Sequence, residues 1–167
     1  MTVNLKATLV EPGKGATYLA LGDLYTFLAT GEDTDGKYAL VEMVLQPQSN
    51  TPQHINEEDE AHYILEGKVE YQLDERTITA IPGTYLYFPK GKGHGFKNIG
   101  STTAKVLMWV TPPGGEQFYA EIGQLVNLLM SEKEKRNLSV PPSPADIEKF
   151  VELALTKYKV KLVPPTL

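Results

Sequence analysis

Short runs of β-branched and aromatic residues recur along the first two thirds of the chain, and glycine, proline and polar residues separate them. This rhythm is typical of many short antiparallel strands, as in a β-sandwich or β-barrel. Turn-forming sequences at 33–36, 66–67, 82–83 and 98–100 each lie between two runs, so we expect hairpins there. The runs span residues 24–29, 38–45, 61–65, 69–73, 77–81, 85–88 and 104–111.

The hydrophobic period changes after the Pro112-Pro113-Gly114-Gly115 stretch. Apolar residues then recur every three or four positions, which predicts an amphipathic helix whose stripe packs against the strands or a partner subunit. The stripe comprises Phe118, Ile122, Leu125, Val126 and Leu129.

A second helix is predicted from Ser143, which has the residue type of an N-cap, to about Tyr158. Pro144 suits the first helical position and Asp146 the first turn. Residues 137–142 are expected to link the two helices, and the prolines of the tail 160–167 favour extended backbone.

The chain of 167 residues is the length of one compact domain. We therefore predict a single domain over 1–167, with an antiparallel β-barrel core at 21–111 and a helical appendage at 115–159. No internal repeat or low-complexity segment interrupts it.

Composition excludes several classes of function. The chain has no cysteine, so thiol nucleophiles and thiolate zinc sites are absent. Its formal net charge of -5, without a basic tract, disfavours nucleic-acid partners and anionic membranes. It also has no phosphate-cradling GxxxxGK[ST] loop and no G-x-S-x-G elbow. Because the sequence shows neither a leader-like start nor a long apolar stretch, we expect a cytoplasmic protein.

All three histidines, His54, His62 and His94, fall in the strand-rich part. Side chains two apart on a strand share a face, so His54 and Asn56 are expected to point one way, and Glu60 and His62 likewise. Two imidazoles and a carboxylate with open positions beside them suit a divalent transition metal that also binds substrate.

Two segments resemble the cupin family at this point. The second cupin motif is complete, from Gly83 through Pro89, Gly91 and His94 to Asn98. The first motif retains His54, Glu60 and the Tyr63-Ile64-Leu65-Glu66-Gly67 that follows, but Asn56 stands where the family usually has a second histidine. The segments 22–31 and 113–118 further resemble a bacterial subgroup related to quercetin dioxygenases. The resemblance implies an all-β jelly-roll barrel, and it implies a homodimer.

The resemblance also implies that His54, Glu60 and His94 ligate one divalent metal, with iron, manganese, nickel, cobalt and zinc not distinguished. Asn56 is the fourth position, where an amide oxygen could ligate weakly, hold a water or leave the site open. His62 is an alternative ligand deeper in the barrel.

Other residues near the motifs have competing interpretations. The remaining acids of the run 57–60 are expected on the surface. Tyr85, Tyr87 and Phe96 are candidates for a substrate pocket, although aromatic residues in strands more often pack in cores.

Three hypotheses for function follow from these features. A barrel of about eight strands has room for one small ligand. The first hypothesis is a metal-dependent dioxygenase of a phenolic or flavonol-like substrate, with Glu60 accepting the hydroxyl proton. The second is a redox-neutral isomerase or lyase that uses the metal as a Lewis acid. The third, motivated by Asn56, is a binding module with a degenerate metal site.

Overall fold

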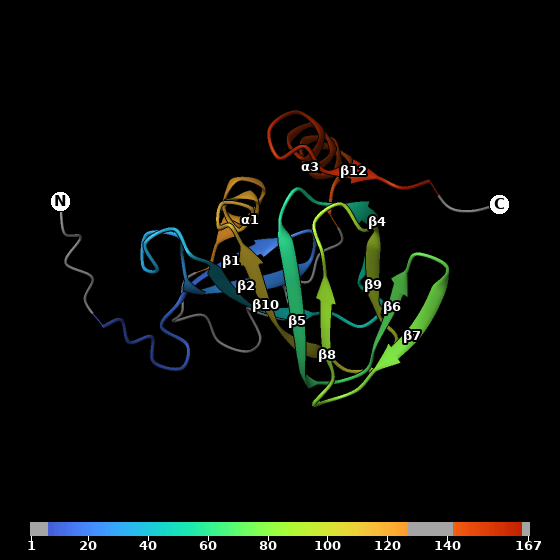
Figure 1. Cartoon of the computed structure of the whole chain (residues 1–167), viewed down its shortest axis with the longest axis horizontal. Coiled ribbons are helices and arrows are strands. Elements are labelled where there is room, and N and C mark those ends of the chain that lie inside the picture. The colour runs from blue at the N-terminus through green and yellow to red at the C-terminus, as the bar shows by residue number, and fades with distance from the viewer. Residues whose placement is uncertain (1–6, 127–141, 165–167) are drawn as a thin grey trace.

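Two antiparallel β-sheets face each other, with short helices at one end of the pair (Figure 1). The computed structural model describes residues 7–126 and 142–164. The larger sheet has the strand order β11-β1-β2-β3-β10-β5-β8, and the smaller has the order β12-β4-β9-β6-β7. The elements are β1 (Ala16–Ala20), β2 (Asp23–Ala29), β3 (Ala39–Leu45), β4 (Asn50–Ile55), β5 (Asp59–Glu66), β6 (Val69–Leu73), β7 (Arg76–Ala80), β8 (Tyr85–Phe88), β9 (His94–Asn98), β10 (Ala104–Thr111), α1 (Gln117–Ile122), β11 (Gln124–Leu125), α3 (Pro144–Thr156) and β12 (Lys161–Leu162).

Alternating burial along the strands forms the core between the sheets. In β3 every second residue, from Ala39 to Leu45, is buried and the residues between them are partly exposed. This is the period expected when one face of a strand packs on a second sheet and the other lies outside. Among the described residues, seventeen buried hydrophobic side chains from both sheets make one continuous cluster.

The all-β fold with C-terminal helices confirms the prediction of fold class, and each predicted run contains a strand. The runs did not include β1, β4 or β9. Strand β4 contains Pro52 and polar residues, and β9 contains Gly95, so neither has the composition of an isolated strand. Pairing with neighbouring strands holds both in place.

The expectation of hairpins at four turns was right for only one. The turn at 33–36 connects β2 to β3, which pair directly. The turns at 66–67, 82–83 and 98–100 carry the chain from one sheet to the other, because β5, β8 and β10 belong to the larger sheet and β6, β7 and β9 to the smaller. Turn residues show where a chain reverses, but they do not show which strand it pairs with next.

The first predicted helix is shorter than its apolar stripe. Helix α1 ends at Ile122, and the chain continues as β11, which pairs with β1. At Gly123 a Cβ atom would lie 2.8 Å from the carbonyl oxygen of Leu19, so the close approach of the two segments requires glycine. Leu125 therefore lies on a strand and is exposed, while Leu129 and residues 137–141 of the predicted linker lie outside the described residues.

The second predicted helix is confirmed as α3. The Ser143 hydroxyl accepts a hydrogen bond from the backbone N–H of Asp146, whose carboxylate accepts one from the backbone N–H of Ser143. Beyond α3, β12 pairs with the edge strand β4, which agrees with the extended tail expected there. Among the described residues, no helix is both long and apolar enough to cross a membrane.

Candidate functional site

Strands from both sheets bring the histidines and Glu60 together inside the barrel, β4 and β9 from the smaller sheet and β5 from the larger. Strands β4 and β9 pair with His54 opposite His94, and the two ring centroids lie 4.6 Å apart. Glu60 and His62 point inward from β5, as the two-residue spacing predicted, and both are buried. Asn56 lies just beyond the end of β4 and still reaches this group.

Protein donors hold both oxygens of the Glu60 carboxylate. The Nε2 atom of His62 donates to Oε1 at 2.6 Å, and the side-chain amide of Asn56 donates to Oε2 at 2.7 Å. Burial alone raises the pKa of Glu60, but the hydrogen bond from the ring of His62 holds this pKa well below its ordinary value. The Nε2 atom of His94 lies 3.5 Å from Oε1. Glu60 is therefore an anion at neutral pH.

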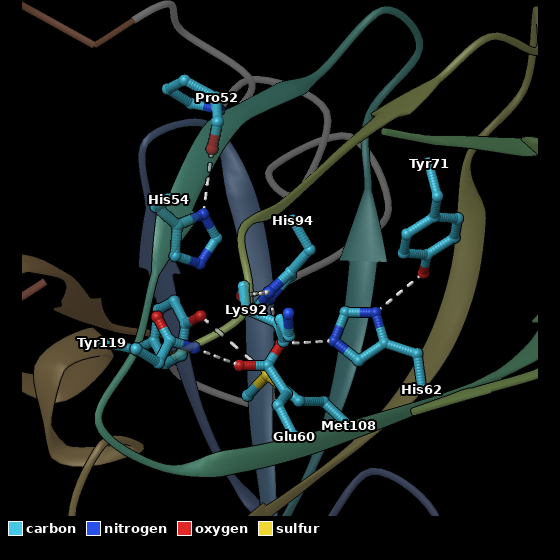
Figure 2. Close-up of polar contacts among 10 residues, drawn as sticks. Pro52, His54, Glu60, His62, Tyr71, Lys92, His94, Met108 and Tyr119 are labelled. Atoms are coloured by element: carbon cyan, nitrogen blue, oxygen red, sulfur yellow. Dashed lines mark hydrogen bonds and ion pairs between the residues drawn. The ribbon is translucent and has the colours of Figure 1, made fainter. Parts of the chain in front are cut away.

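Backbone carbonyls set the tautomers of His54 and His94. The Nδ1 atom of His54 donates to the carbonyl of Pro52 at 2.9 Å, and Nδ1 of His94 faces the carbonyl of Lys92 at 3.4 Å (Figure 2). With the proton on Nδ1, each ring keeps its lone pair on Nε2. The Nε2 atom of His94 is buried and is the only described side-chain polar atom found buried without a hydrogen-bond partner.

His62 is placed differently from the other two histidines. It is fully buried among aromatic rings, and its Nδ1 bonds to the hydroxyl of Tyr71 at 2.8 Å while Nε2 faces Glu60 (Figure 2). Both ring nitrogens are thus engaged with protein groups. This arrangement suits a residue that orients Glu60.

The side chains of His54, His94 and Glu60 can be compared with the ligands that a divalent transition metal needs. Within residues 7–126 and 142–164, no three His, Asp or Glu side chains form a ready-made metal cluster, since Glu60 is turned onto His62 and Asn56. Two facing imidazoles with Nε2 lone pairs, each fixed through Nδ1, nevertheless have the tautomer and the support typical of metal-ligating histidines. With Glu60 beside them, the residues fit a two-histidine, one-carboxylate site.

A cavity of about 480 Å³ opens next to these residues. Aromatic and aliphatic side chains form most of its wall, which is typical of a small-molecule site. Its polar lining residues include Asp23, Ser49, His54, Asn56, Glu58 and Glu60. Its larger apolar and aromatic lining residues include Tyr25, Met108, Val110, Phe118, Tyr119, Ile122, Phe150 and Tyr158.

The predicted aromatic pocket residues do not line the cavity beside the histidines, but Tyr85 and Tyr87 line a second, shallower hollow. Phe96 is buried in the core against His62 and Tyr71. Tyr85 and Tyr87 are 61% and 53% exposed on the outer face of the larger sheet, because the inward positions of β8 belong to Leu86 and Phe88. The sequence shows that neighbouring residues of β8 point to opposite faces, but it does not show which of these faces is internal.

Sequence reasoning missed several residues of the cavity wall. Phe118 and Ile122 were expected only to pack, Glu58 was expected on the surface, and Tyr25, Phe150 and Tyr158 were not considered. Glu58 is instead partly buried, and burial raises its pKa. The helix period did carry a signal for Phe118, since the stripe turns toward the barrel. No local sequence pattern connects Phe150 of α3 with cavity residues as distant in the chain as His54.

Comparison with known proteins agrees with this geometry. The model of the cupin domain family matches residues 41–110, which include β4, β5 and β9. Residues 41–110 therefore form a cupin domain. A similar fold is seen in the polyketide cyclase RemF from Streptomyces resistomycificus, with a TM-score of 0.58, 22% identity and coverage of 81% of this chain and 95% of that one. A predicted oxalate decarboxylase from Thermotoga maritima gives a TM-score of 0.57 at 20% identity, covering 62% of this chain and 97% of that chain.

One curated enzyme is similar in sequence. This protein is 26% identical to quercetin 2,3-dioxygenase from Bacillus subtilis (strain 168) over 116 residues, which are 69% of this chain. The chain spans 34% of the length of that relative.

Proposed function

We propose that this protein is a metal-dependent dioxygenase of a small phenolic or flavonol-like compound. The observation that carries the proposal is the buried, unpartnered Nε2 of His94, which faces the anionic Glu60 and the ring of His54 beside an aromatic-walled cavity. The sequence similarity to quercetin 2,3-dioxygenase supports the oxygenase assignment.

In this proposal His54, His94 and Glu60 hold the metal. Asn56 and His62 are positioning residues, because each donates a hydrogen bond to one oxygen of the Glu60 carboxylate. The hydroxyl of Tyr71 in turn fixes the ring of His62. The arrangement keeps Glu60 oriented toward the cavity side of the two imidazoles.

Glu60 accepts the proton of the substrate hydroxyl. Because a carboxylate with so low a pKa is a weak base, that hydroxyl must itself be made acidic, and a bound divalent metal supplies this acidification together with reactivity toward dioxygen. The proton moves from the substrate oxygen to a Glu60 oxygen, and the hydrogen bonds from Asn56 and His62 keep the carboxyl group in place during the transfer.

The test begins with elemental analysis of untagged protein. We expect near-stoichiometric iron, manganese, nickel, cobalt or zinc in the wild type and its loss in His94→Ala. Asn56→His, which adds the imidazole that the usual motif has, should bind the metal about tenfold more tightly in a competition with a chelator. Oxygen uptake with a panel of flavonols then tests turnover; a wild type that retains no metal after loading with each ion, or consumes no oxygen, contradicts the proposal.

A redox-neutral isomerase or lyase is the second candidate. It is favoured by the pairing of anionic Glu60 with the buried His62 and Tyr71, because these groups can hold and move a proton without an oxidant. Turnover of the substrate under strictly anaerobic conditions would select this candidate, since a dioxygenase stops without oxygen.

A further inference from the structure

Helix α3 and β12 form a wall of the cavity that lies outside the segment matched by the family model. In Figure 1 α3 lies over the same end of the barrel as α1 and β4. From this C-terminal part, Ile147, Phe150, Ala154, Tyr158 and Leu162 line the cavity. The family match ends at residue 110, so this wall belongs to the part of the chain that the match does not cover.

Several contacts fix this wall to the barrel. The carboxylate of Glu121 in α1 accepts hydrogen bonds from Lys157 Nζ at 2.5 Å and from the hydroxyl of Tyr158 at 2.6 Å. Lys149 Nζ donates to the backbone carbonyl of the same residue at 2.7 Å. On the far side, Leu162 in β12 pairs with His54 in β4. The C-terminal segment is thereby attached at one end to α1 and at the other to the strand that carries His54.

Aromatic rings from three elements surround the space between α1 and α3. The Phe118 ring lies 5.2 Å from that of Phe150 and 5.1 Å from that of Tyr158, both in edge-to-face geometry. Tyr25 and Tyr119 stack at 3.8 Å. Such walls bind flat aromatic molecules well, because ring pairs gain energy beyond the burial of apolar area.

The charged groups of the cavity are all acidic among the described lining residues. Asp23, Glu58 and Glu60 contribute carboxyl groups, and neither lysine nor arginine is found in that lining. Burial raises the pKa of Asp23 to about 6, which means that negative charge is already costly in this cavity. An anionic ligand would enter without a cationic side chain to pair with it.

We propose that α3 and the turn after it form a substrate-binding element. Phe150 of α3 and Tyr158 of the turn select flat, uncharged aromatic molecules, and the acidic cavity rejects their anionic derivatives. The inference rests on the proposed function in that it takes the same cavity as the substrate site. It goes further by assigning selection to the C-terminal helix and to charge.

Calorimetric titration of metal-free protein tests this inference without turnover. The probes are quercetin and a ring-sulfonated quercetin, at a pH below the pKa of the quercetin hydroxyls. We expect saturable binding of quercetin by the wild type and at least tenfold weaker binding of the sulfonate. Phe150→Ala should weaken quercetin binding about tenfold, and Phe150→Leu should weaken it less.

The matched control is Leu155→Ala on the same helix, where the side chain is 50% exposed and does not line the cavity. It should bind quercetin like the wild type. If Phe150→Ala folds poorly, the affinity for quercetin is measured with Tyr158→Phe and Phe150→Leu instead, because both variants retain apolar bulk.

The outcomes separate this inference from the proposed function. Equal affinities of Phe150→Ala, Phe150→Leu and Leu155→Ala, binding of the sulfonate as tight as that of quercetin, or no binding by the wild type would each overturn the inference. Binding that depends on Phe150 in a protein that consumes no oxygen would overturn only the oxygenase assignment and support the inference.

Discussion

Buried carboxyl groups fix the cavity at the scale of single residues. Asp23, at the start of β2, is 3% exposed and accepts hydrogen bonds from the backbone N–H of Gln46 at 2.8 Å and from the hydroxyl of Ser49. These bonds tie the first strands to the segment that leads into β4. Even so, burial outweighs the hydrogen bonds and raises the pKa of Asp23 to about 6. The hydrogen bonds of Asp23 connect the strands, but ionisation of its buried carboxyl group lowers the stability of the folded protein.

The cost of ionising Asp23 predicts a pH effect on stability. A raised pKa means that the folded state binds the proton more tightly, so the stability from this group is complete below the unfolded pKa and is lost as the pH rises through about 6. Between pH 5 and pH 8 the loss is about 1.4 kcal/mol. Asp23→Asn should remove this part of the pH dependence, measured by urea unfolding at both values.

A control for this measurement is Glu75→Gln, which changes a charge at an exposed turn. It should keep the pH dependence of the wild type. A difference between pH 5 and pH 8 that is the same in Asp23→Asn as in the wild type would mean that burial of Asp23 carries no such cost.

Close strand pairing brings the histidines together at the scale of elements. The pairing of β4 with β9 is irregular between Thr51 and His54, and it restores His54 opposite His94. Buried Gly95 lies where the two backbones come nearest, since a Cβ there would be 2.8 Å from the backbone nitrogen of Gln53. Because the nearby atoms are backbone, they cannot move aside without shifting β4.

Gly95→Ala should therefore push β4 away from β9. We expect a loss of about 1–3 kcal/mol in the free energy of unfolding, as for other overpacked sites, together with weaker metal retention if His54 is a ligand. Urea unfolding and elemental analysis measure the two effects. Gly93→Ala is the matched control, because its added methyl would meet only side chains, the amide of Gln53 at 3.3 Å and Cγ2 of Val163 at 3.7 Å. Equal stabilities of the two variants would contradict the close-approach argument.

At the scale of the molecule, burial is unevenly distributed over the described residues. Strand β10 pairs with both β3 and β5 in the larger sheet, and every second residue from Ala104 to Val110 is buried. Helix α3 buries only Ala154. The helix and the turn after it are attached mainly through polar contacts with Glu121 and ring contacts with Phe118. The molecule thus combines a rigid barrel with a less firmly held wall of the cavity.

Amide hydrogen exchange should reveal this difference. Segments with few buried contacts open at lower free energy, so α3 should exchange much faster than β10, as measured by mass spectrometry of the full chain. Saturation with quercetin should slow exchange in α3 and leave the mostly exposed strand β7 unchanged. Exchange in α3 as slow as in β10 would contradict this distribution.

Local sequence patterns by themselves determined most of the strands and the start of α3. The runs of β-branched and aromatic residues predicted strands, and Ser143, Pro144 and Asp146 predicted where α3 begins, because capping and strand propensity depend on neighbouring residues. The motif spacing also singled out Glu60 and the histidines that lie around it. These inferences need only the sequence because each depends on a few adjacent positions or on a recognisable spacing.

The tertiary structure alone decided the rest. In β8 the side chain of Phe88 points into the core and that of Tyr87 points outward. An alternating pattern shows that the two residues lie on opposite faces of the strand, but it does not show which face is internal. Three turns cross between sheets instead of closing hairpins, and the pairing of β11 with β1 ends α1 early. The wall formed by Phe150 and Tyr158, and the hydrogen bonds of His62 to Glu60 and Tyr71, join residues that meet only after folding, so their roles follow from long-range packing and not from local sequence.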